Sequence, residues 1–184
     1  MRRSGVLLPV TSLPSRFGIG TFSKEAYAFV DFLKEAGQKL WQILPLGPTG
    51  YGDSPYQAFS TFAGNPYLID LEELIENGWL TEEECENTDW GGSKSYVDYE
   101  KMYQGRFPLL RKAYHNSHIA ENAEFIAFCE ENDWWLSDYA LLMAIKDSQG
   151  GASFLEWDAP LKLREPEAIR RCRHELSDEI CFWQ

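Results

Sequence analysis

The 184-residue sequence is short of positive charge. It has 17 lysines and arginines against 29 aspartates and glutamates, a formal net charge of -12 at pH 7. Such a chain repels phosphate backbones and anionic lipid headgroups, so electrostatics oppose binding to nucleic acid or to a membrane surface. We therefore expect no nucleic-acid partner and no membrane partner, and a neutral substrate suits the composition better.

Long apolar runs are also missing. No run approaches the ~20 residues that a membrane-spanning helix needs. The apolar stretch that follows Arg3 stops at Pro9, which makes it shorter than the roughly 7 residues of a signal-peptide apolar region. We expect a cytoplasmic protein.

Paired metal-binding or redox cysteines are absent as well. The four cysteines form no C-x-x-C pair, and most of them fall in helical patterns, which favours reduced thiols with a packing role. His115 and His118 lie three residues apart, but no third ligand is spaced to complete a zinc site. The sequence therefore predicts no metal. The cysteines are Cys85, Cys129, Cys172 and Cys181.

What the sequence does contain begins with a strand–helix–strand pattern. Residues 6–10 and 40–44 are short apolar runs that end in proline-rich or turn-rich segments, typical of strands. Between them, Ser23 is placed to cap a helix that Gly37 ends. This is a βαβ unit, and its strands have the composition of strands buried on both faces of a parallel sheet. We expect an α/β fold.

The rest of the chain has mainly helical periodicity. Pro108 should bend or restart the helix that contains it, and the apolar rhythm of the last helix runs on to Gln184 without glycine, proline or a polar tail. Because natural chains seldom stop on an uncapped apolar helix, this pattern favours a truncated chain over a docked terminal helix. Helices are expected to begin after Asp70, at Thr81–Glu84, near Tyr99 and at Pro166. Two further helical stretches are expected around 125–131 and 137–145.

The segment 45–57 combines aromatic rings, a hydroxyl, a carboxylate and an amide in a loop that follows a strand. Sugars present flat C–H faces that pack on rings and hydroxyls that bond to such groups, and α/β folds place ligands at the carboxyl ends of parallel strands. The alternative is an ordinary Gly/Pro turn in which Asp53 caps its own backbone. Composition alone leaves both interpretations open.

Several segments in register resemble the 4-α-glucanotransferases, the amylomaltases or disproportionating enzymes of glycoside hydrolase family 77. The resemblance runs through almost the whole chain, and its opening string and the string at 51–57 are the most specific. The strings are VLLPVTSLPS (6–15), FGIG (17–20), GQKLWQILPLGP (37–48), YGDSPYQ (51–57), FAGNPY (62–67), DYAL (138–141) and LREP (163–166).

The resemblance implies the N-terminal part of a TIM (β/α)8 barrel with a mainly helical insertion. Residues 1–70 would be the first βαβ part of the barrel with a glucan-binding loop, and residues 71–184 a helical insertion truncated at its C-terminus. The implied activity is the cofactor-free, retaining transfer of α-1,4-glucan segments between maltodextrins. A (β/α)8 barrel takes about 250 residues, so this chain cannot close one alone.

The resemblance also suggests site residues. Ser54 and Tyr56 resemble donor-side sugar ligands, and Tyr51 resembles an aromatic of an accessory glucan site. Asp53 and Gln57 are further candidates, whose alternative role is to fix the loop.

The family's three catalytic carboxylates lie in motifs that find no match here, so we expect no catalytic residue and an inactive chain. One alternative is a non-catalytic maltodextrin-binding module. Another is a structural domain that binds partners.

Overall fold

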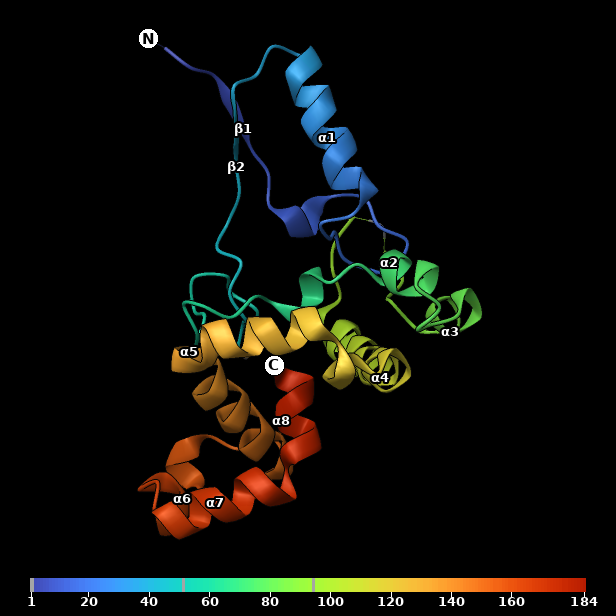
Figure 1. The fold of residues 1–184 in the computed structure, drawn as a ribbon. Coiled ribbons are helices and arrows are strands. Elements are labelled where there is room, and N and C mark those ends of the chain that lie inside the picture. The colour runs from blue at the N-terminus through green and yellow to red at the C-terminus, as the bar shows by residue number, and fades with distance from the viewer. Residues whose placement is uncertain (1, 51, 94) are drawn as a thin grey trace. The chain divides into compact units, whose positions relative to one another are not determined.

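The computed structural model describes residues 2–50, 52–93 and 95–184 (Figure 1). Its contacts divide the chain into two compact units, Met1–Ser117 and His118–Gln184, which we call unit 1 and unit 2. The elements are β1 (Gly5–Leu7), η1 (Val10–Ser12), α1 (Lys24–Glu35), β2 (Leu40–Gln42), η2 (Pro66–Leu68), α2 (Leu71–Glu76), α3 (Glu82–Glu86), α4 (Tyr99–Ser117), η3 (Ile119–Glu121), α5 (Ala123–Ser148), η4 (Phe154–Glu156), α6 (Ala159–Lys162), α7 (Pro166–Glu175) and α8 (Ser177–Trp183).

Unit 1 opens with the predicted βαβ arrangement. The strands β1 and β2 pair in parallel, with Gly5 opposite Leu40. The helix α1 begins where the Ser23 hydroxyl accepts a hydrogen bond from the Glu25 amide, and it is followed by Gly37 with a φ of +72°. The sequence therefore predicted this unit correctly, because its caps and stops are local signals.

The prediction that both strands are buried on both faces is wrong. Every residue of β1 is exposed, with Leu7 at 56%, and β2 is exposed at Leu40 and Gln42. One side of the sheet is covered by α1, where the Phe29 ring packs edge-on against the Trp41 ring. The two ring centroids are 5.1 Å apart. The described residues supply no second layer of cover and form only a two-stranded sheet.

The later helices of unit 1 start where their capping residues stand. Asp70 accepts a hydrogen bond from the Glu72 amide at 3.2 Å at the start of α2. Thr81 and Glu84 form the predicted capping box of α3. The helix α4 continues through Pro108 as one 19-residue helix, so the restart considered for that position does not occur.

In unit 2 the structure differs from two expectations. The helix α5 is one 26-residue helix where two were expected, since its polar stretch contains neither glycine nor proline to break it. The expected last helix, which does begin with Pro166, is two helices, α7 and α8, separated at Leu176 with φ -108° and ψ 22°. One core cluster joins α5 to α8: Ala140, Leu141, Ala144, Ile145, Trp157, Leu161, Ala168, Cys172 and Ile180.

The cysteines and helix lengths complete the description. All four cysteines are free, with Cys85 and Cys172 buried. In the part of the chain that the structure describes, no helix combines the length and the apolarity needed to cross a bilayer. In the sequence, the boundary between the units falls between Ser117 and His118. The assignment of residues 1–70 to a barrel part and of residues 71–184 to an insertion stays a prediction.

Candidate functional site

The candidate site is built on the loop that follows β2. Thr49 and Ala58 form an antiparallel bridge that closes the loop, and the Phe59 amide donates to the Pro48 carbonyl at 3.4 Å. Gly47 permits this closure, because a Cβ there would lie 2.9 Å from the Ala58 Cβ. The loop is therefore held at its base by backbone contacts.

At the tip of the loop, Gly52 and Asp53 both take positive φ angles, 93° and 52°. Aspartate tolerates the left-handed conformation better than most residues, because its short side chain can bond locally. The Asp53 carboxylate accepts a hydrogen bond from the Thr49 hydroxyl at 3.3 Å. This backbone conformation and this bond fix the direction of the carboxylate.

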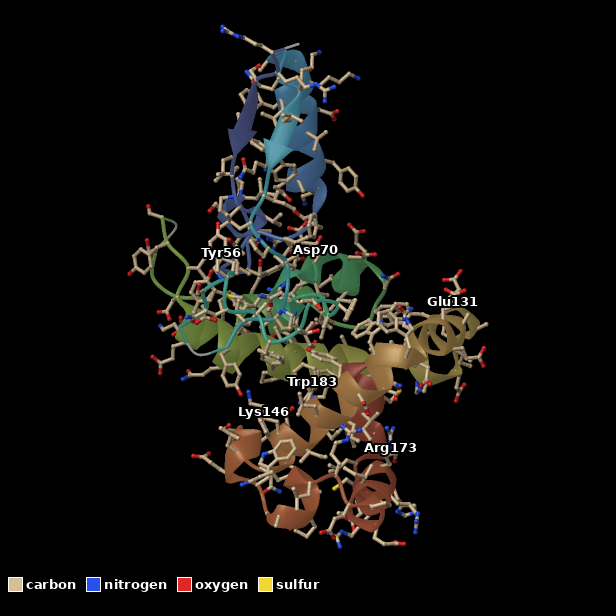
Figure 2. All side chains as sticks on the ribbon, turned by 90° about the vertical axis from the view of Figure 1, so that its left-hand side faces the viewer. Tyr56, Asp70, Glu131, Lys146, Arg173 and Trp183 are labelled. Atoms are coloured by element: carbon tan, nitrogen blue, oxygen red, sulfur yellow. The ribbon has the colours of Figure 1, made fainter. Side chains whose placement is uncertain are left out.

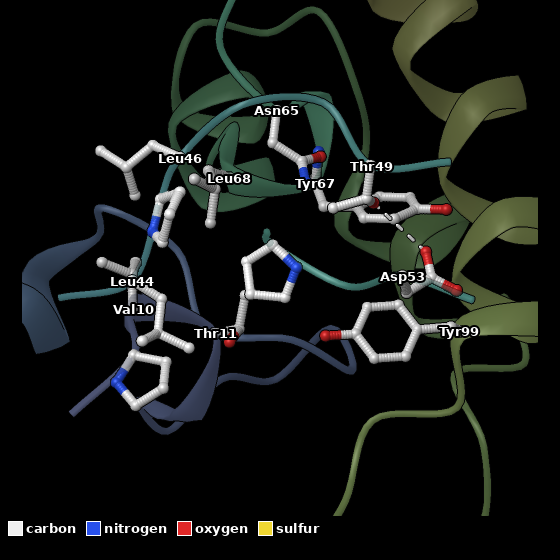
Figure 3. Close-up of a pocket in the computed structure, with 13 residues that line it drawn as sticks. Val10, Thr11, Leu44, Leu46, Thr49, Asp53, Asn65, Tyr67, Leu68 and Tyr99 are labelled. Carbon is white, nitrogen blue, oxygen red and sulfur yellow. Dashed lines mark hydrogen bonds between the residues drawn. The ribbon is translucent and has the colours of Figure 1, made fainter. Parts of the chain in front are cut away.

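Asp53 lines a cavity of about 100 Å³ in unit 1. Figure 3 shows the Thr49–Asp53 hydrogen bond and the Tyr67 and Tyr99 rings beside it. The apolar part of the lining consists of prolines, leucines and Val10. The polar part comes from η1, the loop, the segment before and within η2, and the start of α4: Thr11, Thr49, Asp53, Asn65, Tyr67 and Tyr99.

Burial shapes the ionisation of these groups. It raises the pKa of Asp53, although the Thr49 hydrogen bond acts in the opposite direction. Burial, and then the Asp53 charge, raise the pKa of Tyr67 to about 12. The pKa of Tyr99 is raised for the same two reasons, while its hydrogen bond with Thr11 lowers it. The tyrosine hydroxyls therefore stay protonated at neutral pH. Together with the Asp53 carboxyl group they can hydrogen-bond a neutral, hydroxyl-rich ligand.

One carboxylate limits the chemistry that this cavity can perform. A retaining glycosyl transfer needs a nucleophile and an acid/base, two carboxyl groups ~5 Å apart. Among the described residues that line the cavity, only Asp53 is acidic. The cavity can therefore bind and orient a sugar but does not itself hold the carboxylate pair.

The predicted site residues are distributed unequally around the cavity. Asp53 lines it, whereas Ser54 is half-buried and is not part of the lining. Tyr56 is 75% exposed (Figure 2), and Gln57 is also exposed. Tyr51 lies outside the described residues.

Sequence reasoning missed most of the cavity's polar lining. Thr11, Asn65 and Tyr67 stand in strings that carry the family resemblance, so a signal for them was present. Tyr99 was interpreted only as part of a helical pattern, and nothing local in the sequence connects it to Asp53. In the described ranges, no group of three or more His, Cys, Asp or Glu side chains is arranged to hold a metal ion.

The family model described as 4-alpha-glucanotransferase matches residues 8–184. The 4-alpha-glucanotransferase of Thermus thermophilus is 47% identical over 185 residues, which cover 98% of this chain and 36% of that protein. The 4-alpha-glucanotransferase of Clostridium butyricum is 45% identical over 175 residues, which cover 95% of this chain and 36% of that protein.

Two solved structures are also similar. The amylomaltase from Streptococcus agalactiae in complex with acarbose matches with a TM-score of 0.93 and 45% identity, covering 100% of this chain and 37% of that one. The amylomaltase from Corynebacterium glutamicum matches with a TM-score of 0.68, 19% identity, and coverage of 99% and 26%, which is a likeness of fold alone. The chain thus spans about 36% of the length of these two curated relatives. Because the family model covers nearly all of its residues, the chain belongs to the 4-alpha-glucanotransferase family.

Proposed function

We propose that this chain is the N-terminal part of a cytoplasmic 4-α-glucanotransferase, which transfers α-1,4-glucan segments between maltodextrins. The observation that carries the proposal is the Asp53 cavity, part of whose lining is the loop that follows the parallel strand β2. The whole chain is also 45% identical to an amylomaltase that was solved in complex with acarbose. A maltodextrin is the partner that we infer, and no cofactor is required.

The exposed strands support a further part of the proposal, that residues 1–70 begin a (β/α)8 barrel. The side chains of Leu7 and Leu40 are large, apolar and at least half exposed, and parallel strands occur almost only where both faces are covered. Later strands of a longer polypeptide would cover them. Residues 71–184 would then be a helical insertion within the barrel.

Within this proposal the loop residues bind the donor glucan. Tyr56 offers an exposed aromatic ring on which the C–H face of a sugar can pack. Ser54 and Gln57 supply hydrogen-bonding groups beside it, Asp53 accepts from sugar hydroxyls at the cavity, and Tyr51 contributes to an accessory glucan site. All five act in binding and none in bond breaking.

The proposed reaction is a retaining double displacement. A carboxylate attacks the anomeric carbon and the glycosidic oxygen leaves with a proton from a second carboxyl group; the acceptor's 4-hydroxyl then displaces the enzyme while returning a proton. We propose that these carboxyl groups lie outside the 184 residues. The isolated chain is accordingly expected to be inactive.

Two activity measurements test this proposal. The 184-residue chain incubated with maltotriose should release no glucose and form no longer maltodextrins. Residues 1–184 should instead support transfer when they replace the matching segment of the Thermus thermophilus relative. Turnover by the isolated chain, or a folded chimera that binds glucan but transfers nothing, would contradict the proposal, and the second result would favour the binding module.

A binding measurement tests the loop. Titration of the chain with maltoheptaose should show weaker binding after Tyr56→Ala, because an exposed ring that stacks on a sugar is removed. Tyr27→Ala is a matched control, since Tyr27 on α1 is also 75% exposed but lies outside the loop. Equal affinities of the two variants would remove Tyr56 from the site.

A further inference from the structure

Arg106 on α4 is a charged side chain that unit 1 buries completely. Its exposed fraction is 0%, and the other buried polar residues in the described part of the chain are the neutral Thr21 and Ser23. Burial lowers its pKa to about 10, so the guanidinium keeps its charge at neutral pH. Neither the proposed glucan contacts nor the core packing of α4 requires a charge at this position.

Arg106 connects α4 to Ile69, which directly follows the cavity-lining residues of η2. Its Nη2 donates a hydrogen bond to the Ile69 carbonyl, while Nε and Nη1 have no hydrogen-bond partner among the described residues. The Asp70 carboxylate is the largest favourable charge that acts on it. Asp70, which is labelled in Figure 2, caps α2. Its carboxylate also accepts a hydrogen bond from the Thr21 hydroxyl at 3.3 Å.

Energetics make this arrangement informative. Burying a charge costs several kcal/mol, and replacing a buried charge by a well-packed apolar side chain is often neutral or stabilising. Nε and Nη1 are unsatisfied and Nη2 makes one backbone hydrogen bond, so we expect methionine at this position to leave stability equal or higher. Its effect is better sought in what it holds in place.

What it holds is the turn that carries two of the cavity's polar groups. The Asn65 side chain accepts from the Tyr67 amide at 2.9 Å, and the Asn65 amide donates to the Leu46 carbonyl at 2.8 Å. Both Asn65 and Tyr67 line the cavity with Asp53. Anchoring the chain at Ile69, immediately after η2, therefore restrains the backbone that presents them.

We propose that Arg106 is a positioning residue for the glucan site, which fixes residues 65–70 so that Asn65 and Tyr67 keep their places beside Asp53. This inference rests on the proposed function for its consequence, weaker glucan binding. The fixing of the segment itself does not depend on that function.

The test compares Arg106→Met and Arg106→Lys with the unaltered chain. In Arg106→Met the melting temperature should stay equal or rise. The Kd for maltoheptaose should increase by about tenfold, because a small misplacement of binding groups weakens binding. Arg106→Lys should restore most of the affinity, because an ammonium can still donate to the Ile69 carbonyl. Leu110→Met, one turn later on α4 and also buried, is the control and should change neither quantity greatly.

A merely structural role predicts a different pattern. Melting temperature and affinity would then fall together in Arg106→Met, and Arg106→Lys would rescue both or neither. Affinity that stays within the error of the unaltered chain in Arg106→Met would also overturn the proposal.

Hydrogen exchange separates this inference from the proposed function. The amides of Tyr67, Leu68 and Ile69 are hydrogen-bonded within the segment, and they should exchange faster in Arg106→Met but not in Arg106→Lys. Unchanged exchange there would overturn the positioning role whether or not the chain binds glucan. If the unaltered chain binds no maltoheptaose while exchange changes as described, the proposed binding function fails and the restraint by Arg106 stands.

Discussion

Unit 2 collects nine buried residues from α5 to α8 in a single cluster, whereas the buried side chains of unit 1 include two smaller, separate clusters. One of these, around Val10, Leu13 and Ala26, lies beneath α1. The other gathers Ile19, Tyr67 and Met102. Unit 1 also leaves β1 and β2 largely exposed and buries a charged side chain.

This difference separates a unit that is stabilised mainly by apolar packing from the unit that holds the candidate site. A continuous apolar cluster gains from each methylene that it buries, and unit 2 is built in this way. The candidate site lies in unit 1, where loops, left-handed backbone and buried polar groups take positions that apolar packing would otherwise fill. Unit 1 therefore relies more than unit 2 on the hydrogen bonds of buried polar groups.

The largest expected effect is on the cluster of unit 2. Leu141 is 1% exposed, and Leu141→Ala should lower the free energy of unfolding by about 3 kcal/mol through lost burial and a residual cavity. Denaturant titration measures the change. Leu163→Ala, at a leucine that is 71% exposed, should stay within about 0.5 kcal/mol; equal losses would contradict a single cluster that carries unit 2.

The next effect concerns the exposed strands. Leu7→Ala should change the stability of the 184-residue chain by less than about 0.5 kcal/mol, because the side chain is already in solvent. In the chimera with the Thermus thermophilus relative, later strands should cover Leu7, and the same substitution should cost about 2 kcal/mol. A cost that is the same in both proteins would argue against closure of a barrel over β1.

A smaller effect compares helix caps in the two units. The Asn122 side chain accepts from two amides at the start of α5, at 2.8 and 3.1 Å, and Thr81 caps α3 through its capping box. Alanine at either position should cost about 1 kcal/mol, because an amide loses its partner. Thermal unfolding measures both changes, and Thr81→Ser, which keeps the hydroxyl, is the control. No loss in Asn122→Ala would mean that the packing of α5 alone fixes its start.

The caps also explain which parts of the fold could be predicted. Ser23, Asp70 and Thr81 signal helix starts through bonds to amides two or three residues away, so the sequence contains the whole interaction. The break at Leu176 has no such signal. Leu176 packs against the cluster of unit 2, so residues distant in sequence determine where α7 ends and α8 begins.

The prediction of strand burial and of the site from sequence was limited in the same way, because both depend on residues that are distant in the sequence. The apolar composition of β1 predicts burial, whereas all three of its residues are exposed. For the site, local chemistry pointed to Asp53, whereas Tyr99 comes from the start of α4. A single sequence does not connect positions 46 residues apart. The resemblance supplied Asn65 and Tyr67 as parts of a string, without their place in the cavity.

The smallest expected effect is the pH response of Asp53, which should be confined to unit 1. Burial raises its pKa in the folded chain, so the charged form is disfavoured by folding and the stability linked to the neutral form is lost as pH rises through the folded pKa. Asp53→Asn keeps a side chain that tolerates the left-handed backbone and should be slightly more stable than the unaltered chain at pH 7. The difference should vanish below the unfolded pKa of about 3.9.

Thr49→Val should raise the pKa of Asp53 further, because it removes the hydrogen bond that lowers this pKa. NMR titration of the carboxyl carbon measures the change. Protection factors for hydrogen exchange in unit 2, which are corrected for the intrinsic effect of pH, should show no such response. A pH-dependent change of equal size in them would mean that the two units do not unfold independently.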